Sequence, residues 1–128
     1  MSPLEKHLLR RSFGQLAAHS EQTTALFLDR LQTKNPALLE CLTNGNGSDQ
    51  RWLMEDLAVL IRFADEVDEL GVYLETMRSR WTQIRDGQRR QAEHAFLWAI
   101  EQRLADDYTS KTRAAWLHFF RLLVRLSQ

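Results

Sequence analysis

The chain has 128 residues, enough for one domain with a single continuous core and too few for two ordinary domains. Its 17 Lys and Arg balance its 17 Asp and Glu, and this neutrality argues against nucleic acid as the main partner. One cysteine, Cys41, excludes an internal disulfide and a cysteine-rich metal site, and the longest apolar run, 57–61, is too short to span a membrane. With no apolar signal core at the N-terminus, we expect a reduced, cytoplasmic protein that forms one domain over residues 1–128.

Helix signals recur along the first third of the chain. Ser2-Pro3 is typical of an N-cap followed by proline in the first turn, and apolar residues at helical spacing then predict a helix to about Ala18. Ser20 is expected to cap a second helix, which is apolar on much of its circumference and should be well buried. Asn35-Pro36 repeats the first signal and opens a short helix over 36–42.

The remainder of the chain is also helical in its patterning. Residues 43–49 are turn formers and predict a loop, after which apolar periodicity from Trp52 to Val67 predicts a long helix that ends at Gly71. A short helix over 72–81 and a corner over 82–88 are expected to follow. A long helix over 92–104 then ends at a break over 105–110, where Thr109 or Ser110 caps a final helix. No segment reads clearly as a strand, so the fold class is all-α with about seven helices.

Motifs for catalysis or metal binding are missing from the sequence. It contains neither a Gly-rich phosphate loop nor a Gly-x-Ser-x-Gly segment, and its carboxylates over 65–75 fall on a solvent face. None of the histidines has a partner at metal-ligand spacing: His7, His19, His94 and His118. For His94, a partly buried or surface histidine is favoured over a ligand or proton donor. We therefore expect neither an enzyme nor a metal site.

Five arginines gather in a short stretch with one acid, directly after an acidic run over 65–75: Arg78, Arg80, Arg85, Arg89 and Arg90. One interpretation is a patch that docks an anionic partner, or that pairs with the acidic run of a second copy. The other interpretation is two solvated faces without a partner.

Three segments, in this order, resemble the bacterial globins over nearly the whole chain. They are LLRRSFGQL (8–16), ALFLDRLQTKNPALLECL (25–42) and AFLWAIEQRLADDYTSKTRAAW (95–116). The resemblance implies a globin-like fold, with helices packed at steep angles around a central pocket. The family's usual activity is reversible binding of oxygen or nitric oxide on haem iron, which needs a proximal histidine from the protein.

That histidine is missing from the matching segment, LETMRSRWTQI (74–84). The ligand position falls at Trp81 or within about two residues of it, and no histidine occurs between His19 and His94. An indole nitrogen carries a hydrogen and offers no lone pair to a metal. A haem-contacting phenylalanine of the family is also replaced, by Leu42. The resemblance therefore implies a pocket without haem, filled by Trp81, Leu42, Met77, Phe27, Leu53, Leu57 and Phe96.

Three functions remain open. The first is a haem-free globin-like module for protein interaction or sensing, without catalysis or cofactor, whose partner is an unidentified protein or a second copy in a homodimer. The second is a haem-binding carrier of oxygen or nitric oxide with Tyr73, Met77 or His94 on the iron. The third is a carrier of another apolar small molecule, such as a fatty acid, in the same pocket. Nucleic acid and membrane are not expected as partners.

Overall fold

The computed structural model describes residues 1–43, 51–81 and 86–126, apart from the side chains at positions 43, 52, 78–81 and 86. Within these ranges the chain is helical and contains no strand, which confirms the all-α class and the expected seven helices. The elements are α1 (Pro3–Ala17), α2 (Ser20–Lys34), α3 (Pro36–Thr43), α4 (Arg51–Arg62), α5 (Val67–Trp81), α6 (Asp86–Leu104), the short 3-10 helix η1 (Ala105–Asp107) and α7 (Ser110–Leu126).

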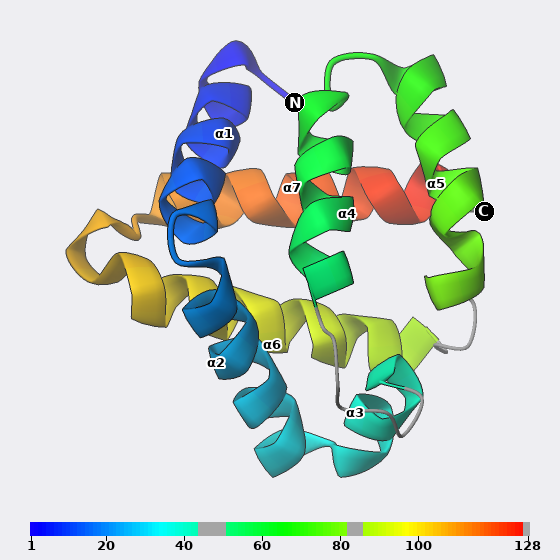
Figure 1. Ribbon diagram of the computed structural model, residues 1–128. Coiled ribbons are helices and arrows are strands. Elements are labelled where there is room, and N and C mark those ends of the chain that lie inside the picture. The colour runs from blue at the N-terminus through cyan, green and yellow to red at the C-terminus, as the bar shows by residue number, and fades with distance from the viewer. Residues whose placement is uncertain (44–50, 82–85, 127–128) are drawn as a thin grey trace.

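The helices form two layers (Figure 1). In the front layer α1, α4 and α5 stand side by side and cross α7 steeply, and α2 continues below α1 to cross α6. The most extensive packing is between α2 and α6 and between α1 and α7. Each front helix keeps exposed residues along one side, although α4 exposes only a narrow stripe.

The two Xaa-Pro helix starts occur as predicted. The Oγ of Ser2 accepts a hydrogen bond from the Glu5 backbone N–H (3.1 Å), and the Glu5 carboxylate accepts one from the Ser2 N–H (3.2 Å), which is a complete capping box. The Oδ1 of Asn35 accepts from the Leu38 N–H (3.1 Å) in the same way. These starts depend on residues within one turn, which is why the sequence reveals them.

The prediction for the second helix is wrong in two respects. Ser20 is the first residue of α2 and not its cap, which is His19, without a side-chain hydrogen bond. Ala25 is exposed, so α2 is buried on one side only. Its buried stripe includes Thr23, whose Oγ1 donates to backbone carbonyls of α1 and of the α1–α2 junction.

The long helix predicted from Trp52 to Gly71 is also wrong. The chain turns after Arg62, and Gly71 lies inside α5 rather than at a helix end. The turn is tight, since the Ala64 N–H donates to the Ile61 carbonyl (3.3 Å). Its Asp65 is held by cations of α1, a contact between distant parts of the chain that helical periodicity does not encode.

Candidate functional site

Six of the seven side chains expected to occupy the pocket are buried in one continuous core. They come from five helices and each is at most 7% exposed: Phe27, Leu42, Leu53, Leu57, Met77 and Phe96. The side chain of the seventh, Trp81, lies outside the described residues. The structure therefore buries these six positions in the core, and their role in place of haem stays a prediction.

Two parts of this core differ in chemistry. Four of the six residues are aliphatic and form the aliphatic side of the core: Leu42, Leu53, Leu57 and Met77. The other two belong to an aromatic cluster on α2, α6 and α7: Phe27, Phe96, Trp116, Phe119 and Phe120. The Phe96 ring is central to it, with its centroid 5.7 Å from Phe27 and 5.6 Å from Trp116 in edge-on or tilted geometry. Such arrangements stabilise aromatic pairs beyond the area they bury.

A buried hydrogen bond joins the aromatic cluster to α1. The Trp116 indole N–H donates to the Oγ of Ser12 (2.9 Å), and that hydroxyl donates to the Leu8 carbonyl (2.7 Å). Ser12 is 4% exposed and Trp116 is fully buried, so neither group can bond to water. The segments 8–16 and 95–116 thus meet directly, a contact that the sequence did not reveal.

The three alternative iron ligands occupy different environments. Met77 belongs to the core. Tyr73 is half-buried and its ring stacks on Phe63, with centroids 4.8 Å apart. His94 is exposed on α6. Of the three, Met77 alone belongs to the buried core.

The predicted arginine patch is described only in part. Arg89 is half-buried and Arg90 is exposed at the start of α6, whereas Arg85 and the side chains of Arg78 and Arg80 lie outside the described residues. One turn further along α6, partial burial raises the pKa of Glu93, against the opposing effect of nearby cations that include Arg89 and Arg90. The described part of the patch therefore includes a carboxyl group.

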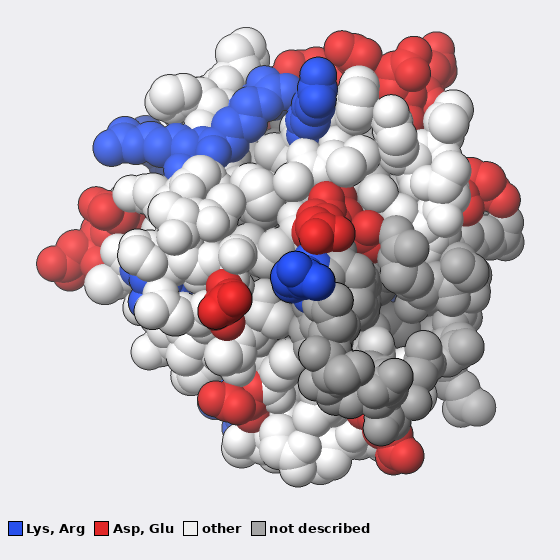
Figure 2. All heavy atoms as spheres, viewed as in Figure 1, with Lys and Arg blue, Asp and Glu red and all other residues white. Residues whose placement is uncertain are grey.

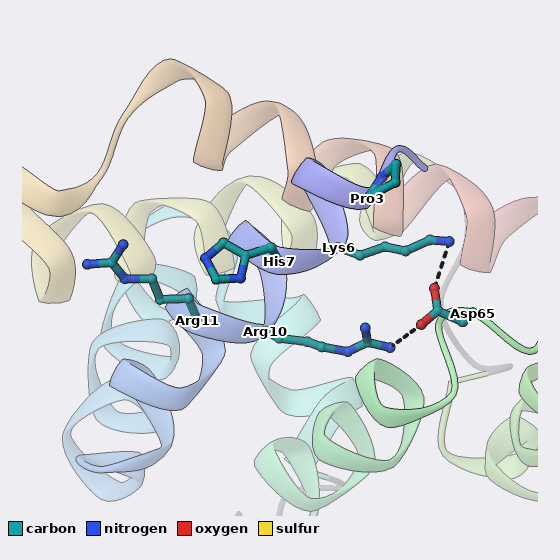
Figure 3. Close-up of a pocket in the computed structure, with 6 residues that line it drawn as sticks. All are labelled: Pro3, Lys6, His7, Arg10, Arg11 and Asp65. Atoms are coloured by element: carbon teal, nitrogen blue, oxygen red, sulfur yellow. Dashed lines mark hydrogen bonds and ion pairs between the residues drawn. The ribbon is translucent and has the colours of Figure 1, made fainter.

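A second basic region, which the sequence reading missed, lies on α1. It is a shallow surface depression of about 590 Å³ lined by Pro3, Lys6, His7, Arg10, Arg11 and Asp65. The Lys6 Nζ lies 2.7 Å from one Asp65 oxygen and Arg10 Nη2 lies 2.8 Å from the other, while Arg11 and His7 point the opposite way (Figure 3). The available signal was KHLLRR (6–11), where basic side chains recur four residues apart. Lys6 and Arg10 therefore share one side of the helix, and His7 and Arg11 share another.

No protein-family model matches the sequence, and a comparison with curated proteins finds no match. In residues 1–43, 51–81 and 86–126, no three His, Cys, Asp or Glu side chains are placed to hold a metal ion together. No described helix is both long enough and apolar enough to cross a membrane.

Proposed function

We propose that this chain is a haem-free, globin-like module for protein interaction or sensing, without catalysis. The observation that carries the proposal is the joint burial of the six side chains expected where a globin holds porphyrin. Loss of the proximal histidine, with Trp81 in its place, is the sequence feature that points the same way.

The helix arrangement supports the globin-like part of the proposal. Globins pack their helices pairwise at steep angles, and α1, α4 and α5 cross α7 steeply here (Figure 1). The hydrogen bond between Ser12 and Trp116 ties together two segments that resemble the family independently. An all-α protein with a similar number of helices, but without this packing of α1 on α7, would not bring segments 8–16 and 95–116 together.

The packing of the aliphatic side supports the absence of haem. Leu53, Leu57 and Met77 are each 4–6% exposed, so a porphyrin between α4 and α5 would have to displace side chains that are now buried in the core. Such displacement loses the burial of each side chain, about 1.5–3 kcal/mol for a leucine or methionine. Met77 offers the iron only a thioether sulfur, which is a weak electron-pair donor. An iron–sulfur bond there would offset little of the packing energy lost.

The carrier functions remain alternatives with less support. A haem carrier would have Met77 on the iron, since Tyr73 is stacked on Phe63 and His94 is exposed. A fatty-acid carrier would need the same six side chains to separate. Cytoplasmic location and the absence of a nucleic-acid partner are part of the proposal and rest on the sequence.

The test is an absorbance titration of purified protein with haemin, beside an apo-globin as positive control. We expect no stoichiometric Soret band in this chain. A stoichiometric band that disappears in Met77→Ala and persists in the exposed-site variant His94→Ala would replace the proposal with the haem carrier. A saturable, one-to-one displacement of a fluorescent fatty acid would favour the apolar carrier instead.

A further inference from the structure

The outward face of α1 is basic with an apolar residue at one end. Arg10, Arg11 and His7 are exposed and Lys6 is half-buried, and the only acid of this helix, Glu5, is turned toward α7, where it meets His118. Lys6 and Arg10 share the single carboxylate of Asp65, so this face keeps a positive excess. Leu4, in the first turn, is 53% exposed.

The outward face of α5 has the opposite charge. Asp68, Glu69 and Glu75 are exposed there, and no Lys or Arg occurs between Val67 and Met77. Val72 lies among these carboxylates and is 61% exposed, and Val67 in the first turn is 50% exposed. Together with Leu4, these two valines are the exposed large apolar side chains of the described residues.

The two faces flank α4 on the same side of the molecule. In Figure 1 α1 and α5 both begin at the upper end and run downward, with α4 between them. Figure 2 shows Lys and Arg gathered at the upper left, over α1, and Asp and Glu along the upper right, over the α4–α5 corner. The exposed residues described on α4 are Arg51, Glu55, Ala58 and Arg62, so the strip between the two faces contains both charges and one small residue, Ala58.

We propose that a second copy of this chain docks on this face, with a two-fold axis running along α4. Rotation about that axis places α1 of each copy over α5 of its partner, in the same direction along the helices. Because both helices begin at the same end, Leu4 then meets the valines, and the basic residues of α1 meet the carboxylates of α5. Each interface contains this contact twice, since a two-fold interface is isologous.

Two observations favour a second copy of this chain as the partner over a different, anionic molecule. The positive and negative faces are both on one chain and flank α4, which makes the surface complementary to itself. The exposed apolar side chains are divided between the same two helices, so one docking event buries all three. Lys6 and Arg10 turn toward Asp65, whereas Arg11 turns away from it (Figure 3). The cations of α1 are therefore spread over an extended surface and are not all directed at one small anion.

The test uses paired charge reversals read by native mass in sedimentation equilibrium at low ionic strength. The basic-face variant is His7→Glu with Arg11→Glu, which leaves the Asp65 pairs intact, and the acidic-face variant is Asp68→Lys with Glu69→Lys. Wild type should have twice the 15.0 kDa chain mass and dissociate as salt is added. Each variant alone should dimerise at least about tenfold more weakly, because like charges then face each other.

Mixing the two variants should restore a dimer of wild-type affinity, since both contacts of the mixed pair again join opposite charges. The control matched to the basic-face variant is Gln32→Glu with Lys34→Glu, the same change in formal charge with His7 neutral, on exposed α2 positions outside this face. It should leave the dimer intact. A monomeric wild type, variants that dimerise like the control, or a mixture that stays monomeric would each overturn the inference.

This inference rests on the proposed function in one respect: it names a second copy of the chain as the partner of the interaction module. A haem-free monomer would refute the dimer and leave the haem-free module standing. A dimer that binds haem would refute the proposed function and leave the docking face standing.

Discussion

The aromatic cluster and the aliphatic side of the core are equally buried but are held together differently. The cluster packs its rings edge-on and is joined to α1 by the hydrogen bond from Trp116 to Ser12, so its contacts have direction as well as volume. The four residues of the aliphatic side, Leu42, Leu53, Leu57 and Met77, carry no side-chain N–H or O–H group, so their own packing depends on shape and volume. Directional contacts fix how α1, α6 and α7 dock, whereas the region expected to hold haem in a globin can exchange one apolar side chain for another.

Truncation of the tryptophan should have the largest effect. Trp116→Ala removes a fully buried indole and should lower the free energy of unfolding by about 3–5 kcal/mol. Leu57→Met on the aliphatic side nearly conserves volume and should cost less than about 1.5 kcal/mol. Urea unfolding of both variants measures the gap, and equal losses would mean that the two regions do not differ.

Removal of the serine hydroxyl should have an intermediate effect. Ser12→Ala leaves the buried Trp116 N–H without its acceptor, at a cost of about 1–3 kcal/mol. Ser12→Ala combined with Trp116→Phe removes both partners, so the double variant should be more stable than the sum of the single losses implies. Strictly additive losses in a double-mutant cycle would show that the hydrogen bond contributes nothing.

The smallest effect is expected on the surface, at Asp65. Hydrogen bonds from Lys6 and then Arg10 lower the pKa of this carboxyl below its ordinary value. A lowered folded-state pKa contributes stability above the unfolded-state value, about 3.9, and that contribution is lost as pH falls through the folded-state pKa.

Asp65→Asn should therefore destabilise the protein at neutral pH and have little effect at pH values below the lowered pKa. Because the Asp65 side chain is 42% exposed, water screens the pair and the loss should be at most about 1 kcal/mol. Urea unfolding across the acid range, beside Asp29→Asn at an exposed site of α2, makes the measurement. If Asp65→Asn lowers the free energy of unfolding by the same amount in acid, the loss has a cause other than the ion pairs.

Burial of the six pocket residues was predictable from the sequence, because helical spacing turns each one inward. Their place in a haem-type pocket follows from the resemblance alone and stays a prediction. The sequence did not single out the basic face of α1, because arginines are denser along the chain at 78–90. Much of that stretch lies outside the described residues. Charge density along the chain is a poor guide to charge on a face, since neighbours in sequence diverge by about 100° on a helix.

The sequence by itself determined the helical class and the helix starts at Pro3 and Pro36, because a capping side chain, a proline and apolar spacing act within one or two turns. Only the tertiary structure decided the break after Arg62, where Asp65 bonds to Lys6 and Arg10, and the acceptor for Trp116, which lies 104 positions away at Ser12. Those contacts form only when α1 docks on its neighbours. Their energies depend on distances in space, which local patterns in the sequence do not specify.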